Sequence, residues 1–243
     1  MKIYGLIGYP LSHSFSKGFF AKKFEAENIT DCLYDNFPIP AITEFPTLLH
    51  QQPHLNGLNV TIPYKEVIIP YLDGLNDAAA RIGAVNCIRF EGGKKIGYNT
   101  DVIGFSNSIR PLILPHHTHA LVLGTGGAAK AVMYALQEMN IAYTLVSRQA
   151  TAEAIAYDAL DQAVIEKHTV IINTTPLGMY PQVDAAPDIP YQYLTSRHLL
   201  YDLVYNPAVT LFLQRGVAQG AITKNGHDML ILQAEASWEI WNG

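Results

Sequence analysis

The 243-residue chain has few charged residues, 15% in all, and more acidic than basic ones, so its formal net charge is -5. The chain therefore lacks the excess of basic residues that would neutralise a phosphate backbone, which argues against a nucleic-acid partner. An anionic small molecule stays compatible, because a few local cations can bind it. Hydrophobic residues make up 49% of the chain, which is enough for a sizeable buried core and too many for a disordered protein.

Cysteines and long apolar runs are also scarce. Cys32 and Cys87 form neither a CxxC pair nor the framework of a disulfide-rich domain, and this usage fits a reducing compartment. No stretch approaches the roughly 18 consecutive apolar residues of a membrane span, and the amino terminus shows no long apolar signal core. These features predict a cytoplasmic protein that does not act at a membrane.

The residue pattern predicts an α/β fold whose first hundred residues differ from the rest. Apolar runs at 3–7, 56–62, 85–90 and 96–100 are typical of strands, and the last two flank a glycine turn that favours a hairpin. Helical spacing at 15–24 and 75–82 completes a mixed-sheet α/β region. From about residue 118, apolar runs alternate with helical segments, which is typical of a parallel, doubly wound sheet. A helix is expected after His227.

The segment LVLGTGGAAKA, residues 121–131, carries the clearest chemical signal. A strand ending at Gly124 is followed, through Gly126, by a helix that begins near Gly127. Such a turn brings backbone N–H groups close to a ligand, and the helix N-terminus favours a pyrophosphate. Ala128 and the alanine after it keep the helix close to the sheet. The context predicts dinucleotide binding, with a purely structural turn as the alternative.

The end of the next strand, LVSRQ, indicates which dinucleotide is bound. An NAD enzyme typically places an acidic residue there to hold the ribose 2′-hydroxyl, whereas this chain has Ser147 and Arg148. Arginine cannot accept that hydrogen bond but can pair with a 2′-phosphate. NADP is therefore favoured over NAD, the alternative being that Arg148 is only a solvated loop charge.

Further segments narrow the reaction. They are LSHSFS at 11–16, NVTIPYK at 59–65, GAVN at 83–86, GYNTDVIGF at 97–105, NTTPLGM at 173–179, YNP at 205–207, and NGHDML followed by QA at 225–234. In content and order they closely resemble the shikimate dehydrogenase family, which reduces 3-dehydroshikimate to shikimate with NADPH. The resemblance covers nearly the whole chain.

The resemblance implies two α/β domains with the active site in the cleft between them. A mixed-sheet substrate domain would span 1–102 and be completed by the C-terminal helix at 227–243. A Rossmann-like NADP domain would span 103–226. Monomer and homodimer both stay open.

The resemblance also assigns the catalytic roles to Lys65 and Asp101. A lysine ammonium can donate a proton to the oxygen formed by carbonyl reduction and stabilise its charge, while the aspartate would hold the lysine and a substrate hydroxyl. A close Lys–Asp pair titrates as a unit, so the sequence does not divide the proton transfer between them. A surface lysine and a helix-capping aspartate are the ordinary alternatives.

The remaining site residues follow from the same matches. The two serines of the first motif would hold the ring carboxylate, although serines also tie loops together. The substrate-binding set is Ser14, Ser16, Asn59, Thr61, Asn86, Tyr205 and Gln233. The cofactor-binding set is Gly124, Gly126, Gly127, Ala128, Ser147, Arg148, Thr174, Leu203 and Gly226, the last three on the nicotinamide side.

The chain departs from the family pattern at four places: Lys17 replaces a proline, Cys87 a threonine, and Ser147 and Gln149 an asparagine and a threonine. The last two changes weaken the NADP prediction. The PHHTH run at 115–119 lacks carboxylates at ligand spacing, so no metal is expected.

Three other functions stay open. They are a quinate/shikimate dehydrogenase using NAD or both cofactors, a non-catalytic ligand sensor, and a dehydrogenase of another small carboxylated alcohol. A sensor would be expected to lack Lys65 or Asp101, and this chain has both.

Overall fold

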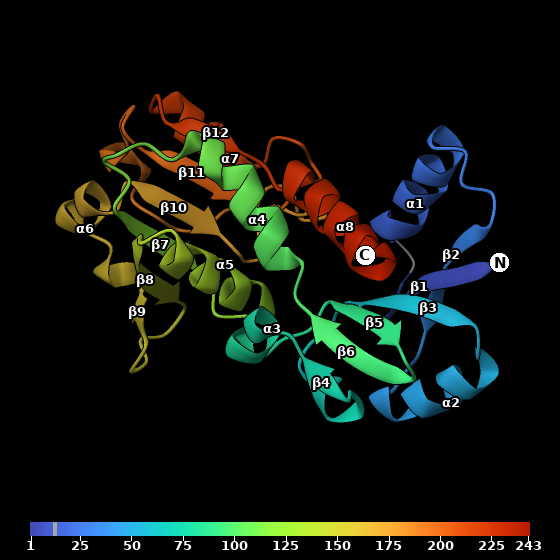
Figure 1. Ribbon diagram of the computed structural model, residues 1–243. Helices are drawn as coiled ribbons and strands as arrows, with labels where there is room; N and C mark the ends of the chain where they lie inside the picture. Colours follow the sequence, from blue (N-terminus) through green and yellow to red (C-terminus); the bar gives the residue numbers. More distant parts are fainter. Residues whose placement is uncertain (12–13) are drawn as a thin grey trace. The chain divides into compact units, whose positions relative to one another are not determined.

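The computed structural model describes residues 1–11 and 14–243 and divides into two compact units (Figure 1). Unit 1 comprises residues 1–100 and 233–243, and unit 2 comprises residues 101–232. The sequence predicts a substrate domain that ends at residue 102 and resumes at 227, whereas unit 1 ends at 100 and resumes at 233. The assignment of the substrate to one unit and of the cofactor to the other stays a prediction. Ser12 and His13 of the first motif lie outside the described residues.

Unit 1 contains a six-stranded mixed sheet in the order β2-β1-β3-β5-β6-β4. The strands β1, β2 and β3 run parallel, whereas β5 pairs antiparallel with β3 and with β6, so the predicted hairpin and mixed sheet are confirmed. The elements are β1 (Lys2–Gly8), α1 (Phe15–Ala26), β2 (Cys32–Pro38), α2 (Phe45–Gln51), β3 (Leu55–Val60), β4 (Gly74–Leu75), α3 (Asp77–Ile82), β5 (Cys87–Glu91) and β6 (Lys94–Tyr98). Two 3₁₀ turns, η1 (Ile42–Glu44) and η2 (Ile69–Tyr71), join them.

The last helix, α8 (His227–Asn242), begins in unit 2 and packs its second half into the core of unit 1. The Trp241 ring stacks on Tyr4 with 4.9 Å between ring centroids, and its Nε1 donates to the Ile88 carbonyl at 3.0 Å. A Cβ at Gly57 would lie 2.3 Å from this indole, so β3 needs glycine there. Trp241 is therefore a packing residue of unit 1.

Unit 2 contains a six-stranded, all-parallel sheet in the order β12-β11-β10-β7-β8-β9. The predicted doubly wound sheet is confirmed, and its strand order reverses between β7 and β10. The elements are α4 (Asp101–Ile109), β7 (His119–Leu123), α5 (Gly127–Glu138), β8 (Ala142–Ser147), β9 (Ala154–Ala156), α6 (Gln162–Lys167), β10 (Val170–Asn173), β11 (Leu199–Asp202), α7 (Leu211–Ala218) and β12 (Ile222–Lys224). Three 3₁₀ turns are η3 (Arg110–Leu112), η4 (Tyr157–Ala159) and η5 (Tyr191–Tyr193).

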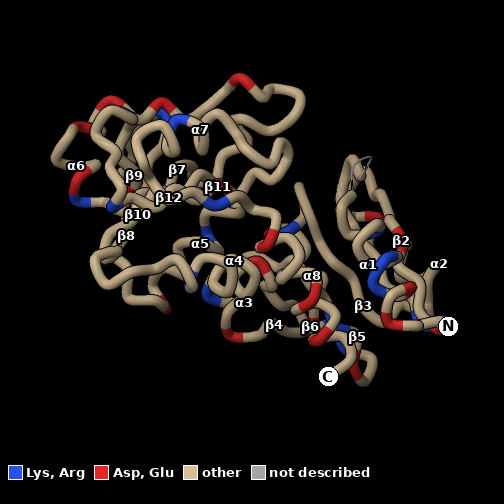
Figure 2. Tube along the Cα trace, turned by 90° about the horizontal axis from the view of Figure 1, so that it is seen from above, with Lys and Arg blue, Asp and Glu red and all other residues tan. Residues whose placement is uncertain are grey.

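Charged residues of both signs are scattered along the trace of each unit (Figure 2). Within residues 1–11 and 14–243, no helix is both long and apolar enough to cross a membrane.

The same part of the chain holds no cluster of three His, Cys, Asp or Glu side chains that could bind a metal. In the PHHTH run, His116 and His117 each place Nε2 3.1 Å from the Arg197 carbonyl.

Candidate active site

The carboxyl ends of the central strands of unit 2 carry most of the predicted cofactor residues. In an open α/β sheet, ligands bind at this edge, where the strand order reverses. Thr174 directly follows β10, and both its backbone N and its Oγ1 bond to the carbonyl of Leu123 at the end of β7, at 2.9 and 2.7 Å. Gly124 N in turn bonds to the Val146 carbonyl of β8 at 2.8 Å. The ends of three neighbouring strands are thus held together.

The glycine turn after β7 contains two glycines of different kinds. Gly124 has φ +106, and a Cβ there would lie 2.8 Å from Thr174 Oγ1, so the fold itself requires glycine. Gly126 caps α5 with φ -79, and no atom lies within 4 Å of the place its Cβ would take. This cap makes no side-chain hydrogen bond, and Ala129 N donates to the Gly126 carbonyl at 2.9 Å. The open space at this helix N-terminus fits a pyrophosphate.

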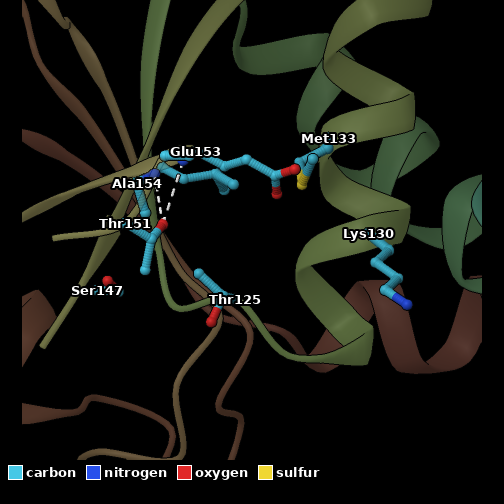
Figure 3. A pocket seen from close by; sticks show the side chains of 9 residues that line it. Thr125, Lys130, Met133, Ser147, Thr151, Glu153 and Ala154 are labelled. Atoms are coloured by element: carbon cyan, nitrogen blue, oxygen red, sulfur yellow. Dashed lines mark hydrogen bonds between the residues drawn. The ribbon is translucent and has the colours of Figure 1, made fainter. Parts of the chain in front are cut away.

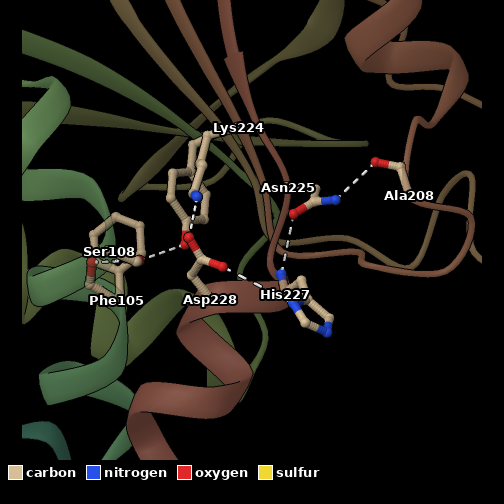
Figure 4. Close-up of polar contacts among 8 residues, drawn as sticks. Phe105, Ser108, Ala208, Lys224, Asn225, His227 and Asp228 are labelled. Atoms are coloured by element: carbon tan, nitrogen blue, oxygen red, sulfur yellow. Dashed lines mark hydrogen bonds and ion pairs between the residues drawn. The ribbon is translucent and has the colours of Figure 1, made fainter.

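The ends of β11 and β12 bring two further cofactor residues into contact. A Cβ at Gly226 would lie 2.1 Å from the Leu203 carbonyl oxygen, so this approach is possible only for glycine. The loop that carries Gly226 is tied down by Asn225, which donates to the Ala208 carbonyl at 2.8 Å and accepts from His227 N at 3.2 Å (Figure 4). Asp228 forms an ion pair with Lys224 in the same view.

Asp202, the last residue of β11, is fully buried beneath this edge. Its carboxylate accepts from Asn173 Nδ2 and Val204 N, each at 3.0 Å, and from Thr210 Oγ1 at 2.5 Å. Removal from water outweighs these hydrogen bonds and raises the pKa of Asp202 to about 6. Asp202 therefore joins the loops after β10 and β11, and it was not among the predicted site residues.

The raised pKa of Asp202 predicts a pH-dependent stability for unit 2. Between pH 3.8 and about 6 the folded state holds a proton that the unfolded state has released, so stability falls as pH rises through this window. Asp202→Asn cannot titrate and should therefore gain stability relative to wild type across the window, by at most about 3 kcal/mol. Thermal unfolding followed by circular dichroism at several pH values measures the difference. A gap between the two proteins that does not change with pH would contradict the assignment.

In unit 1, a buried polar network connects several predicted substrate residues. Asn59 accepts from the Tyr34 hydroxyl at 2.9 Å and donates to the Asn86 carbonyl at 3.1 Å and to Ser237 Oγ at 2.9 Å. Its amide is thus fully occupied inside the protein. Burial raises the pKa of the Tyr34 phenol, whose oxygen also receives a hydrogen bond from Ser16. The substrate contact predicted for Asn59 stays a prediction. These hydrogen bonds favour a role in which Asn59 positions the residues that it contacts.

The same network fixes Asn86. Its Oδ1 accepts from Thr100 N at 2.6 Å, and its Nδ2 donates to Thr100 Oγ1 at 3.0 Å. Gln233 Oε1 lies 3.5 Å from Asn86 Nδ2, and the Gln233 carbonyl accepts from Ser237 at 2.9 Å. The structure therefore brings Asn86 and Gln233 together, although they are 147 residues apart in the chain.

Ser14 presents a different situation at the start of α1. It is the N-cap residue, but its side chain makes no capping hydrogen bond. Its Oγ is buried and has no hydrogen-bond partner among the residues that the structure describes. A buried hydroxyl without a partner costs free energy, and a helix N-terminus attracts negative charge. Both features fit a bound carboxylate.

The other predicted residues lie on turns or helix starts. Thr61 and Lys65 follow β3. The Lys65 carbonyl accepts a hydrogen bond at 2.7 Å from the backbone N of Val85, the residue that precedes Asn86. Asp101 is the first residue of α4, and Tyr205 lies in the loop after β11. Lys65 belongs to unit 1, whereas Asp101 and Tyr205 belong to unit 2.

Comparison with known proteins adds an independent line of evidence. Residues 6–88 match the family model described as the shikimate dehydrogenase substrate binding domain. A shikimate dehydrogenase (NADP(+)) from Methanosphaera stadtmanae is 36% identical, over 99% of this chain and 91% of that protein. The chain belongs to the shikimate dehydrogenase family.

Solved structures agree with this membership in the family. The Thermus thermophilus shikimate 5-dehydrogenase in complex with NADP(H) and shikimate has a TM-score of 0.88 at 28% identity, covering 100% of this chain and 94% of that one. A 5-ketofructose reductase from Gluconobacter has a TM-score of 0.87 at 28% identity, covering 99% and 92%. The fold of the shikimate dehydrogenase family is thus also that of an enzyme named for a different substrate.

Sequence reasoning missed Tyr34, Thr100, Ser237 and Asp202. Each is buried and polar, which is the signal that could have found them, but burial is not visible in a single sequence. In this member of the shikimate dehydrogenase family, these four residues hold the predicted ligand-binding residues in place.

Proposed function

We propose that this protein catalyses the reversible, NADPH-dependent reduction of 3-dehydroshikimate to shikimate. One observation carries the proposal most directly, namely the buried Ser14 hydroxyl without a partner at the N-terminus of α1. It suits the carboxylate of shikimate, while the open Gly126 turn of unit 2 suits a dinucleotide. Membership in the shikimate dehydrogenase family supports the combination.

The proposed chemistry divides between the cofactor and the chain. The reduced nicotinamide, when bound, supplies the two electrons and one hydrogen that reach the carbonyl carbon. Lys65 donates the proton that the carbonyl oxygen requires, and its charge stabilises the developing negative charge there. In the reverse direction Lys65 accepts this proton from the hydroxyl. Asp101 holds a ring hydroxyl, while Asn86 and Gln233 hold further hydroxyls.

A direct spectrophotometric assay tests this function. Mixing the purified protein with shikimate and NADP should produce the near-ultraviolet absorbance of reduced nicotinamide, with quinate and NAD giving much slower reactions. A faster reaction with quinate or with NAD would favour the quinate/shikimate dehydrogenase. A sugar ketone without a carboxylate, 5-ketofructose, should not oxidise NADPH, and turnover of it would move the protein to the reductase of the same fold. No turnover with any of these would favour a ligand sensor.

The buried network predicts that Tyr34→Phe impairs substrate binding more than it impairs binding of NADP. The change removes the hydroxyl between Ser16 and Asn59 but keeps the ring that stacks on Phe20 at 4.4 Å between centroids. Loss of one buried hydrogen bond is expected to raise KM for shikimate by about fivefold, with KM for NADP unchanged.

Tyr4→Phe provides a matched control for that variant. Tyr4 is another buried tyrosine of unit 1, whose hydroxyl donates to Asn242 at 3.2 Å and which has no bond to Asn59. Initial rates over a range of shikimate concentrations separate KM from kcat. An equal rise of KM in both variants would reduce Tyr34 to a purely structural residue.

The proposal also covers the ligands of the protein and its cellular compartment. A small-molecule substrate and a nicotinamide cofactor are its ligands, and the cytoplasm is the compartment that suits its two free cysteines.

A further inference from the structure

A cavity of about 460 Å³ lies next to the carboxyl end of β8 in unit 2 (Figure 3). Its walls include Ser147 at the end of β8, Thr125 of the glycine turn, Met133 of α5, and Glu153 of the turn before β9. In a doubly wound sheet, the adenosine ribose of a dinucleotide lies beyond the glycine turn, at the end of the second strand. The cavity is therefore where that ribose and its 2′ substituent would lie.

The charged residues around this cavity are not those that a site made only for NADP would need. Arg148, which was predicted to pair with the 2′-phosphate, is exposed on the turn after β8 and is not one of the lining residues. Lys130 lines the cavity, but its ammonium points away from Glu153 (Figure 3). Glu153 thus places a negative charge on the cavity wall.

The backbone around Glu153 is held firmly. Thr151 Oγ1 accepts from Glu153 N at 3.2 Å and from Ala154 N at 3.0 Å, and Thr151 N donates to the Ala154 carbonyl at 2.8 Å. Ala154 also begins β9, which pairs in parallel with β8 from Leu145 onward. Within this turn the Glu153 side chain extends toward Met133 of α5 (Figure 3).

We propose that Glu153 is a specificity-determining residue that shifts the dinucleotide preference of this protein from NADP toward NAD. The inference rests on the proposed function, in that unit 2 binds a nicotinamide dinucleotide. A carboxylate on the wall repels a doubly charged 2′-phosphate, and it can accept a hydrogen bond from a ribose 2′-hydroxyl. Arg148 acts in the opposite sense, so Glu153 lowers a preference for NADP that Arg148 raises.

Binding measurements on Glu153→Gln test this without requiring turnover. Calorimetric titrations of the full chain would use NADP, NAD, and two fragments without nicotinamide, adenosine 2′,5′-bisphosphate and AMP. We expect affinity for NADP and for the bisphosphate to rise by about 3- to 10-fold, the scale of one or two partly screened charge pairs. Affinity for NAD and AMP should stay the same or fall. Arg148→Ala should instead weaken NADP and the bisphosphate selectively.

Glu138→Gln is the matched control, because it removes the same charge from an exposed position. Glu138 is the last residue of α5, about 17 Å along the helix from its first residue, Gly127. The Glu138→Gln substitution should change neither the affinity for NADP nor the affinity for NAD.

Three outcomes separate the inference from the proposed function. An unchanged NADP-to-NAD affinity ratio in Glu153→Gln, or an equal effect of Glu138→Gln, overturns the role of Glu153. Failure of the wild-type protein to bind either dinucleotide overturns both the role and the function. The expected ratio change in a protein that does not oxidise shikimate supports Glu153 and overturns only the proposed reaction.

Discussion

Replacing Lys65 by alanine is expected to lower kcat for shikimate oxidation by about a hundredfold or more, while KM for shikimate changes only a few-fold. The variant lacks the group that removes the hydroxyl proton, but it keeps the backbone that carries the site. The Lys65 carbonyl still accepts from Val85 N, a 2.7 Å bond that does not involve the side chain. The turn after β3 and the neighbouring Asn86 should therefore stay in place.

A second substitution separates proton transfer from charge. Lys65→Arg keeps a positive charge, but arginine does not release its proton in proteins, so kcat should stay low while KM returns toward wild type. Lys95→Ala serves as the control within unit 1, since Lys95 is paired with Asp73 at 2.7 Å and has no proposed role in the site. Steady-state kinetics in both reaction directions provide the measurement. Turnover within a few-fold of wild type in Lys65→Ala would remove this residue from the proton transfer.

The sequence predicted those parts of the fold whose signal is local. The hairpin of β5 and β6 follows from the EGGKK turn, and the Rossmann-like sheet follows from the strand–helix rhythm after residue 118. β2 was not predicted, because CLYDNFP at 32–38 mixes apolar and polar residues without a clean period. Its place in the sheet comes from parallel pairing with β1 over all seven residues, and such pairing depends on tertiary contacts.

The same distinction applies to the candidate site. The glycine turn could be recognised from residues 121–131 alone, because phosphate binding at a helix start needs a contiguous motif. The hydrogen bond from Asn59 to Ser237 joins residues 178 positions apart, and no spacing rule relates them. Asp202 looks like an ordinary strand end in the sequence, although the fold removes its carboxylate from water. Residues that hold the ligand-binding groups in place are therefore the ones that the sequence conceals.

The glycines of unit 2 make that distinction measurable. Gly126→Ala is expected to weaken dinucleotide binding by about tenfold or more, because the second glycine of the turn lets the backbone approach the pyrophosphate. The fold itself should tolerate the change. Its φ of -79 suits alanine, and no atom lies within 4 Å of the new Cβ. The loss of a favourable cap residue should lower stability by only about 1 kcal/mol.

Gly226→Ala should show the opposite balance. Its Cβ would lie 2.1 Å from the Leu203 carbonyl oxygen, and backbone cannot move aside as a flexible side chain can. A loss of roughly 3 kcal/mol in stability is expected, on the scale of severe overpacking. Thermal unfolding by circular dichroism and calorimetric titration with NADP measure both quantities for both variants. If Gly126→Ala bound NADP as tightly as wild type, the open turn at the start of α5 would not be the pyrophosphate site. If it were instead as unstable as Gly226→Ala, the glycine would serve the fold rather than the ligand.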